Sequence, residues 1–362
     1  MKRVPQPEPR ANVIQVGRPC RKDLVITEKA LTMPRILRFH EHGLITDKLR
    51  MEQVPDRQPV RDEVLIQVDA FALNRADVMF VDGYYTTEAH LPSRIGSEVS
   101  GTVLAAGPDV RSVSVGSRAS TIPYPGNNAY GVNGETALVQ EYVVTHTPPG
   151  LSAEEAASIW MQYLTAYFAF CEKLKLEADD AVFFSAASSS AALGGIQLVK
   201  MLGVTTIAAT RTPAKRDFLL QAGADHVLIS SEENVSERIL EITNGKGVRV
   251  AYDPVFGKYV EGYAQAMSKH GIIINYGLLG ADQALPFVSF WQKATTVYFY
   301  SMYNHVMDPA QLARGKAMIH GGIASGHLRP IIDSVFPFER YLDAYRHMLG
   351  GTQQGKIVVK VK

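Results

Sequence analysis

A run of small polar residues between a strand and a helix is the first place in this chain where chemistry is expected. Residues 182–200, VFFSAASSSAALGGIQLVK, begin as an apolar strand and end as an amphipathic helix. The free N–H groups and the positive dipole end of a helix start favour a phosphate group. Serine hydroxyls can cap such a helix and also donate hydrogen bonds to phosphate. The stretch therefore predicts a phosphate loop formed by Ser188, Ser189, Ser190 and Ala191.

The same loop lacks the glycines that usually mark dinucleotide binding. The G-x-G-x-x-G positions fall on Ala187, Ser189 and Ala192, although each glycine normally has its own steric task. All three replacements are small, so backbone can still approach a pyrophosphate, and Gly194 and Gly195 follow one turn later. A serine-capped helix that binds no ligand fits the loop equally well, and the loop by itself leaves both interpretations open.

The end of the next expected strand indicates which ligand the loop would take. A fold that prefers NAD places an acidic residue about 20 positions on, against the ribose hydroxyls. Residues 209–216, ATRTPAKR, contain no acid and offer Arg211, Thr212 and Lys215 instead. Cations and hydroxyls suit the 2′-phosphate of NADPH through charge-assisted hydrogen bonds. The sequence therefore predicts NADPH, against the alternative of a solvated helix start.

Two kinds of element must position these residues. From Met33 to about Tyr142 the pattern is mostly β, with turn residues between short alternating runs. The strands expected there are 63–73, 98–107, 116–122 and 137–144. A helix follows at 151–175, and it opens on the capping-box pair Ser152 and Glu155. This first part predicts a small, barrel-like β unit.

After Asp180 the pattern changes to apolar strands that alternate with helices. The strands expected there are 181–186, 204–210, 226–230, 248–253, 271–277 and 295–302. This alternation predicts an α/β fold with a doubly wound parallel sheet that is covered on both faces. The chain closes on GKIVVKVK, a final strand expected to return to the β-rich part.

Bulk composition excludes several classes of partner. The formal net charge of the 362-residue chain is +1, so no bulk attraction to nucleic acid or to an acidic membrane is expected. No run approaches the roughly 20 apolar residues of a membrane helix. Two cysteines, Cys20 and Cys171, cannot form a thiolate zinc site, and a reducing cytoplasm is the expected location. Residues 1–32, rich in Pro, Arg and Lys, are expected to be a poorly ordered extension.

Several segments in the same order resemble one family. They are ALNRADVMFVDGYY (72–85), LPSRIGSEVSGTV (91–103), MQYLTAY (161–167), QAGADHVL (221–228) and GKIVV (355–359). With both halves in view, the chain resembles the medium-chain dehydrogenase/reductase superfamily, in its zinc-independent quinone oxidoreductase and enoyl reductase branch. The resemblance implies a GroES-like domain at 33–155 and 325–362, interrupted by a Rossmann domain at 156–324, with the cofactor between them.

The resemblance also bears on zinc. Zinc-dependent relatives carry Cys where this chain has Asn74, and Gly-His-Glu where it has Gly96, Ser97 and Glu98. Zinc needs about four N, S or O ligands, of which one can be water or substrate. Only Glu98 remains of these, and residues 120–135 lack the four cysteines of the family's structural zinc lobe. No metal site is therefore expected.

Without a metal, another group must handle the oxyanion and the proton. The candidates are Asn74 as a donor to the developing charge and Tyr85, which occupies the place of the proton-donating tyrosine of the enoyl reductases that the chain resembles. A phenol is a suitable weak acid for a transient enolate. Because Tyr84 is adjacent, the sequence leaves open which of the two tyrosines matches the family's proton donor. Tyr85 could instead be an aromatic lid residue.

Further cofactor contacts are implied by the resemblance and by the rule that ligands lie at the carboxyl ends of such strands. The alternative for each of them is a buried turn or a core contact. The expected residues are Gln162, Thr165, Asp253, Val255, Gly277, Leu278, Phe299, Tyr300 and Met302.

These patterns lead to one main functional hypothesis and two alternatives. The main hypothesis is an NADPH-dependent, zinc-independent reductase that transfers hydride to a quinone or an activated C=C bond of a small molecule. The alternatives are a metal-free carbonyl or alcohol oxidoreductase and a non-catalytic nucleotide-binding protein of the same fold. The resemblance further implies a homodimer that forms through the last Rossmann strand.

Overall fold

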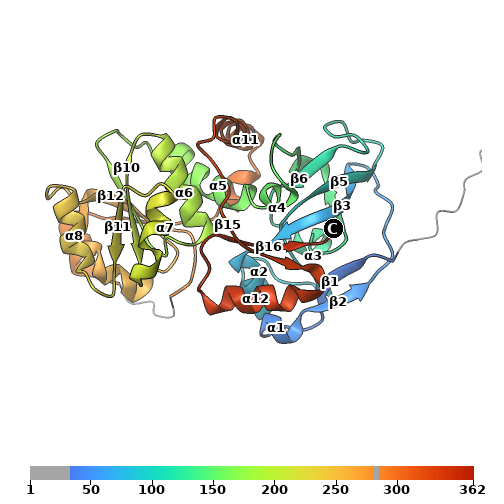
Figure 1. The fold of residues 1–362 in the computed structure, drawn as a ribbon, viewed down its shortest axis with the longest axis horizontal. Coiled ribbons are helices and arrows are strands. Elements are labelled where there is room, and N and C mark those ends of the chain that lie inside the picture. The colour runs from blue at the N-terminus through green and yellow to red at the C-terminus, as the bar shows by residue number, and fades with distance from the viewer. Residues whose placement is uncertain (1–32, 281–284) are drawn as a thin grey trace, which may run out of the picture. The chain divides into compact units, whose positions relative to one another are not determined.

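Three β-sheets and the helices around them organise the described part of the chain (Figure 1). The structure, a computed structural model, describes residues 33–280 and 285–362. The expected extension at 1–32 lies outside the described residues. We call the six-stranded sheet with its helices the dinucleotide lobe, and the other two sheets, built from the first and last parts of the described chain, the β-rich lobe.

The dinucleotide lobe contains a parallel sheet. Its strands are β9 (Ala181–Phe184), β10 (Thr205–Thr210), β11 (His226–Ile229), β12 (Val248–Asp253), β13 (Met267–Asn275) and β14 (Thr296–Phe299). Their order in space is β11-β10-β9-β12-β13-β14. Strands β10 and β11 are added on one side of β9, and the later strands are added on its other side. Doubly wound sheets bind their ligands at the place where the strand order changes side in this way. The predicted doubly wound sheet is confirmed.

Alternate side chains of each strand enter two different cores. Val182 and Phe184 of β9 pack into one buried cluster, whereas Ala181 and Phe183 pack into the other. This alternation follows from the period of two along a strand, and it explains why the strands are apolar throughout. The helices of the lobe cover both faces. They are α5 (Trp160–Tyr167), α6 (Ser190–Met201), α7 (Arg216–Gln221), α8 (Val235–Ile242), α9 (Phe287–Lys293), α10 (Tyr303–Val306) and α11 (Pro309–Ala324).

The β-rich lobe is built around a long central strand, β3. Its larger sheet contains β3 (Glu63–Ala72), β5 (Glu98–Ala106), β6 (Arg118–Thr121), β7 (Thr136–Gln140), β8 (Val144–His146), β15 (Ile332–Pro337) and β16 (Lys356–Lys360). Its smaller sheet contains β1 (Arg35–Phe39), β2 (Arg50–Gln53) and β4 (Ser93–Arg94). Strand β16 pairs antiparallel with β3, so the expected return of the final strand is confirmed.

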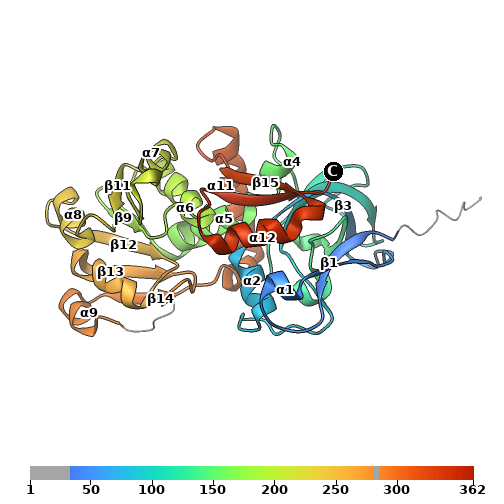
Figure 2. The same ribbon diagram turned by 60° about the horizontal axis from the view of Figure 1, so that its bottom comes forward.

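Short helices complete the β-rich lobe. They are α1 (Ile45–Lys48), α2 (Arg75–Asp82), α3 (Asn127–Tyr130), α4 (Ala153–Ala156) and α12 (Tyr341–Gly350). Figure 2 shows α12 beside β15, with α1 and α2 close to it. Helix α2 matters most for function, because it leads from the end of β3 to Tyr85.

The helix expected over 151–175 is interrupted, which corrects the prediction. It begins as predicted at Ser152, whose hydroxyl accepts from the backbone N–H of Glu155 at 3.1 Å. After α4 the chain breaks and starts again as α5, where the backbone N–H of Met161 donates to the Glu98 carboxylate at 2.9 Å. A cap supplied by a different strand leaves no local pattern in the sequence. The strand expected over 137–144 is likewise split, into β7 and β8.

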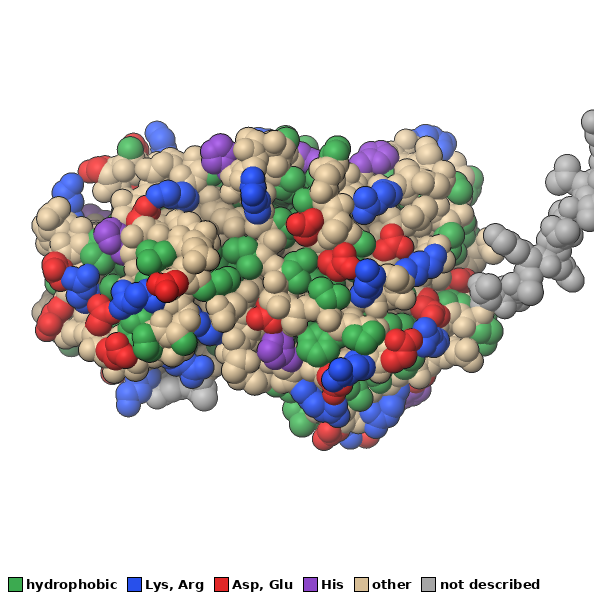
Figure 3. Space-filling view, in the orientation of Figure 1, with side chains coloured by type: hydrophobic (Ala, Val, Ile, Leu, Met, Phe, Trp, Pro, Cys, Tyr) green, Lys and Arg blue, Asp and Glu red, His purple; other side chains and the backbone are tan. Residues whose placement is uncertain are grey.

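The surface carries both signs of charge. Lys, Arg, Asp and Glu side chains are interspersed over the face seen in Figure 3, so no single sign of charge dominates there. No helix within the described ranges has both the length and the apolar character needed to cross a bilayer.

A buried ion pair lies in the β-rich lobe, close to the start of α5 in the dinucleotide lobe. The ammonium group of Lys356 pairs with the Glu98 carboxylate, and the two side chains are 1% and 0% exposed. The same ammonium donates to the Asn74 side-chain oxygen at 2.7 Å. Because Glu98 also caps α5, this network fixes the start of β16, the end of β3, the start of β5 and the entry into the dinucleotide lobe.

The first prediction concerns this ion pair. Lys356→Met leaves the Glu98 carboxylate buried without its cation, which should lower the free energy of unfolding by about 3–5 kcal/mol. The double variant Lys356→Met with Glu98→Gln should lose less, because no uncompensated charge remains. Urea unfolding measures both. Lys246→Met is the control, since Lys246 and Asp179 form an exposed pair worth at most about 1 kcal/mol. Equal losses of unfolding free energy in Lys356→Met and Lys246→Met would contradict the view that Lys356 neutralises a buried carboxylate.

Candidate functional site

The serine-rich loop between β9 and α6 has the form of a phosphate loop. Ser189 caps α6, with its hydroxyl accepting from the backbone N–H of Ala192 at 3.4 Å. The N–H groups of Ser190 and Ala191 lie in the first helical turn, where no partner exists within a helix. Ala186 has a φ of 44°, a conformation that favours glycine. The loop therefore makes a tight turn before α6, at the cost of backbone strain at one alanine.

The missing last glycine is replaced one turn further on. Ala192 is fully buried, so its methyl group is accommodated. A Cβ atom on Gly195 would lie 2.8 Å from a ring carbon of Phe184, and one on Gly194 would lie 3.1 Å from the backbone oxygen of Gln162. Both distances are too short for an unstrained side chain. Gly194 and Gly195 thus provide the close approach of α6 to β9 and α5 that a dinucleotide loop needs.

Lys215 lies directly on this loop. Its ammonium donates to the Ser188 hydroxyl and to the backbone oxygen of Gln353, each at 3.0 Å. Burial lowers the pKa of Lys215, as does the nearby Arg211. The backbone N–H of Gly355 also donates to the backbone oxygen of Ser188 at 3.0 Å. The loop is therefore bordered by a lysine from the dinucleotide lobe and by backbone from the β-rich lobe.

The other residues at the end of β10 have different surroundings. Arg211 is exposed. Thr212 caps the following turn, since its hydroxyl accepts from the backbone N–H of Ala214 at 3.4 Å. Arg216 faces away from the loop, donating to the backbone oxygen of Val227 at 3.1 Å and to Glu233 at 3.2 Å. Of the three cations in this segment, Lys215 contacts the serine-rich loop, Arg211 is exposed, and Arg216 is engaged away from the loop.

The loops that follow β12 and β13 are joined to each other. Asp253 is fully buried, and its carboxylate accepts from Ser185, from the Tyr263 hydroxyl and from the backbone N–H of Val255. The backbone N–H of Leu279 donates to the Pro254 oxygen at 2.8 Å. Asp253 therefore shapes the loop that carries Val255 instead of pointing outward.

Two of the expected cofactor residues lie in the second of these loops. A Cβ atom on Gly277 would lie 2.8 Å from Pro254, so glycine is needed for the two loops to meet. Leu278, next to it, is 45% exposed.

Four of the residues expected to contact the cofactor come together around α5. The Thr165 hydroxyl lies 3.3 Å from the Met302 sulfur, and the Tyr300 hydroxyl donates to the Thr165 backbone oxygen at 2.9 Å. Gln162, one turn earlier, is 2% exposed and donates to the backbone oxygen of Ser158. Phe299 is separate from this group, because its side chain is 66% exposed at the end of β14.

The two adjacent tyrosines differ in burial, which shows which of them faces the interior. Tyr84 is 58% exposed, whereas Tyr85 packs against the main core. The Tyr85 ring lies edge-on to Tyr303, with 6.4 Å between ring centres. Burial raises the pKa of Tyr85 and the nearby Asp77 raises it further, although the Tyr303 hydroxyl acts in the opposite direction. Tyr85 is therefore a protonated phenol near neutral pH, which is the state that a proton donor needs.

The place where relatives bind zinc is filled by other groups. The Asn74 amide faces Lys356 and Glu98, with its nitrogen donating to the Glu98 carboxylate at 3.3 Å. Within the part of the chain that the structure describes, no three His, Cys, Asp or Glu residues are grouped to hold a metal ion. An amide, the Ser97 hydroxyl and a lysine ammonium do not fit a zinc site.

Asp77 adds a titratable group beside this network. It is fully buried, and its carboxylate accepts from the backbone N–H of Asn74 at 3.0 Å. Burial raises the pKa of Asp77 to about 7, against the lowering effects of that hydrogen bond and of Lys356. The bond ties the start of α2 to Asn74, so it helps to set where Tyr85 lies.

Sequence reasoning missed Lys356 and Asp77, and it did not pair Tyr303 with Tyr85. Lys356 and Asp77 stand inside segments that carried the family resemblance, but a lysine in a strand and an aspartate in a helix have no local sign of burial. Tyr303 follows the last strand of the dinucleotide lobe, and its proximity to Tyr85 exists only once the lobes have met.

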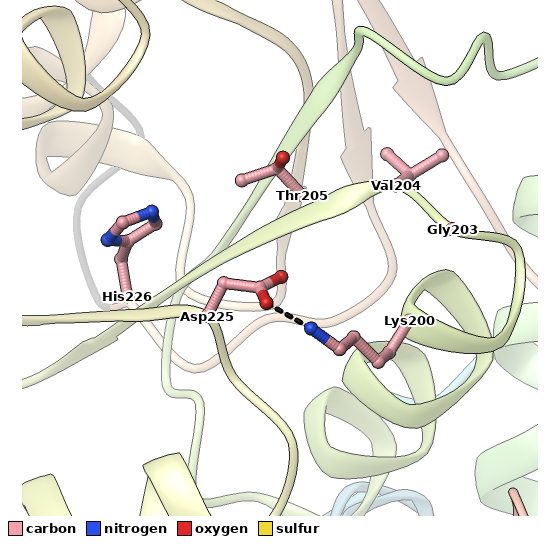
Figure 4. A pocket seen from close by; sticks show the side chains of 6 residues that line it. All are labelled: Lys200, Gly203, Val204, Thr205, Asp225 and His226. Carbon is pink, nitrogen blue, oxygen red and sulfur yellow. Dashed lines mark hydrogen bonds and ion pairs between the residues drawn. The ribbon is translucent and has the colours of Figure 1, made fainter.

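Two hollows in the surface lie elsewhere. Figure 4 shows one that is lined by Lys200, Asp225 and His226. It lies where β10 and β11 begin, opposite the strand ends that carry the candidate site. The second is lined by Tyr124, Pro125, Gly126, Ala129, Tyr130, Gln140, Tyr142 and Met307. This second hollow joins residues of both lobes.

Comparison with known proteins agrees with this geometry. The family model described as "Alcohol dehydrogenase GroES-like domain" matches residues 60–167, and the one described as "Zinc-binding dehydrogenase" matches residues 192–314. The second description mentions zinc, but this chain has Asn74 and Ser97 at the positions where zinc-dependent relatives have metal ligands.

Individual relatives point to a branch of this family. The chain is 31% identical over 220 residues to a quinone oxidoreductase of Pseudomonas aeruginosa, covering 61% of this chain and 66% of the relative. It is 28% identical over 317 residues to a phenolphthiocerol/phthiocerol polyketide synthase of Mycobacterium tuberculosis, covering 87% of this chain but only 14% of that much longer protein.

A solved structure extends the comparison over the whole fold. A mycobacterial protein determined as a complex with NADPH superposes with a TM-score of 0.82 at 25% identity, covering 91% of this chain and 100% of that one. Matches to both family models in chain order, together with these relatives, identify the family: the chain belongs to the medium-chain dehydrogenase/reductase superfamily, in its quinone oxidoreductase branch.

Proposed function

We propose that the protein is an NADPH-dependent, zinc-independent reductase that delivers a hydride to a quinone or to an activated C=C bond. The observation that carries the proposal is the position of Lys215, whose ammonium lies on the phosphate loop at Ser188. The mycobacterial structural relative was solved with NADPH, and the Pseudomonas relative is named a quinone oxidoreductase, which supports the same cofactor and acceptor class. The protein acts on a small molecule, with the cytoplasm as its expected location.

The residues of the chain fit NADPH. Ser188, Ser189, Ser190 and Ala191 would hold the pyrophosphate at the start of α6, and Lys215 with Arg211 would meet the 2′-phosphate. Thr165, Tyr300 and Met302 would border the nicotinamide ring, which supplies a hydride from its C4 atom when the cofactor is bound. The boundaries that we propose for the two domains are 33–155 with 325–362, and 156–324.

The proton required by this reaction would come from Tyr85. Hydride addition to a conjugated acceptor develops negative charge on the conjugated oxygen, and a positioned weak acid completes the reduction. Tyr85 is protonated and packed at the junction of the lobes. Asn74 is engaged with Lys356 and Glu98, so its contribution is to orient the start of α2 and hence Tyr85.

A panel of one quinone, one enone and one simple ketone, with NADPH oxidation as the readout, tests the acceptor class. Turnover with the ketone alone would favour a carbonyl reductase, and no NADPH binding in calorimetry would favour a non-catalytic protein.

The second prediction tests the cofactor. Lys215→Ala should weaken NADPH binding by about 10- to 100-fold, because a hydrogen bond to a charged group is lost, while NADH binding should change little. Isothermal titration calorimetry with both nucleotides gives the comparison. Arg216→Ala is the matched control, because it removes the same charge one residue on from a side chain that faces Glu233. Equal weakening of both nucleotides would refute the assignment of Lys215.

The third prediction tests the proton donor. Tyr85→Phe should lower kcat by about 100-fold or more, the usual contribution of a positioned general acid, with NADPH affinity unchanged. Tyr84→Phe, the same substitution at the exposed neighbour, should leave kcat within about twofold of the wild-type value, because no proton-transfer group is lost. Steady-state kinetics with the best acceptor of the panel would decide. Near wild-type turnover in Tyr85→Phe would remove Tyr85 from proton transfer.

We also propose a homodimer through the edge of the dinucleotide sheet. Strand β14 is the last strand in its sheet, and nothing in the described ranges pairs with its outer side. The preceding helix α9 exposes Phe287, Val288 and Trp291, the last by 80%. A free strand edge beside exposed apolar side chains is typical of an interface.

The fourth prediction follows from this surface. The wild-type protein should have the mass of a dimer in multi-angle light scattering, and Trp291→Glu should shift it toward the monomer because a charge enters the apolar contact. Val115→Glu is the control, since Val115 is 65% exposed in the turn between β5 and β6, away from β14. A monomeric wild-type protein would exclude the dimer.

A further inference from the structure

A second buried phenol approaches Tyr85 from the other lobe. Tyr303 begins α10, just after the last strand of the dinucleotide sheet, whereas Tyr85 follows α2 in the β-rich lobe. Their rings are perpendicular, at 84°, with centres 6.4 Å apart. Tyr303 is 8% exposed. The two phenols therefore meet at the junction, although 218 positions separate them in the printed sequence.

Polar atoms at this place lack partners. The Tyr303 hydroxyl and the Ser97 hydroxyl are both buried and form no hydrogen bond within the described part of the chain, and Ser97 is 4% exposed. Burying an unsatisfied hydroxyl is costly. A buried group without a partner in one state can have a catalytic role, and the ring of Tyr85 lies beside that of Tyr303.

The neighbouring hydroxyl groups shift the pKa values of Tyr85 and Tyr303 in definite directions. Burial raises the pKa of both phenols above the ordinary value for tyrosine. Within that trend the Tyr303 hydroxyl lowers the pKa of Tyr85, and the Ser97 hydroxyl lowers the pKa of Tyr303. Each hydroxyl thus favours negative charge on the next one, in the order Ser97, Tyr303, Tyr85.

We propose that Tyr303 is a positioning residue that stabilises Tyr85 while Tyr85 gives up its proton, and that Ser97 supports Tyr303 in turn. This inference rests on the proposed role of Tyr85 as the proton donor. The O–H bond of Tyr85 breaks as its proton goes to the carbon of the acceptor next to the one that has received the hydride. The electron pair stays on the Tyr85 oxygen, to which Tyr303 donates a hydrogen bond. Tyr85 recovers a proton from water after the product leaves.

The arrangement links proton transfer to the meeting of the two lobes. Tyr303 belongs to the chain segment that also carries Tyr300 and Met302, the residues expected at the nicotinamide. Ser97 stands next to Glu98, whose carboxylate holds the start of α5. The donor pair is therefore complete only when the lobe that would bind the cofactor and the lobe that carries Tyr85 are in contact.

The fifth prediction tests Tyr303. Tyr303→Phe should lower kcat on the order of tenfold, less than the loss of the general acid itself, with little change in KM for the acceptor or in NADPH affinity. The solvent deuterium isotope effect on kcat should increase, because proton transfer becomes more rate-limiting. Tyr252→Phe is the matched control, since Tyr252 is another buried phenol whose hydroxyl has no partner among the described residues. It should change neither quantity.

A double-mutant cycle separates a relay from a structural effect. Ser97→Ala should lower kcat less than Tyr303→Phe does, and the double variant should be no slower than Tyr303→Phe alone, because Ser97 acts through Tyr303. Fully additive losses, or a reduced kcat with an unchanged isotope effect, would overturn the inference. Urea midpoints close to the wild-type value exclude loss of fold.

The outcomes also distinguish this inference from the proposed function. If the wild-type protein oxidises no NADPH with any acceptor, or if Tyr85→Phe keeps full turnover, the proposed function fails. If the wild type and Tyr85→Phe behave as expected but Tyr303→Phe matches the wild type, only the role of Tyr303 fails.

Discussion

The ion pair between Lys356 and Glu98 is the interaction on which the arrangement of the site depends. Taking an ammonium and a carboxylate out of water costs several kcal/mol per ion, and the cost is tolerated only when the remaining hydrogen-bonding capacity is used. Here Asn74 and the backbone N–H of Met161 use it. The pair therefore ties β5 and β16 to the end of β3, and Glu98 links them to the start of α5 in the other lobe.

The same short segment of chain serves both halves of the site. Gln353 and Gly355 contact Lys215 and the phosphate loop through backbone groups, while Lys356 turns into the buried network. A displacement of this segment would therefore reach the phosphate loop and the start of α2 together. This segment therefore connects the serine-rich loop of one lobe to the buried network beside Asn74 in the other.

Much of the fold could be predicted, because regular elements leave periodic patterns. The six parallel strands and the return of the final strand to β3 agree with the predictions. The phosphate loop was harder, since Ala187, Ser189 and Ala192 replace its glycines. Only the packing of Gly194 against Gln162 and of Gly195 against Phe184 explains why a loop without those glycines still has the required shape.

The sequence by itself determined which chemical groups are available: small residues and serines at a helix start, cations in place of an acid after β10, two adjacent tyrosines, and no cysteine or histidine where relatives bind zinc. Tertiary structure decided which of them act together. It turned Tyr85 inward and Tyr84 outward, placed Lys215 on Ser188, and brought Tyr303 to Tyr85. The physical reason is that periodicity and capping are local, whereas burial, charge pairing and contact between lobes join residues that are far apart in the chain.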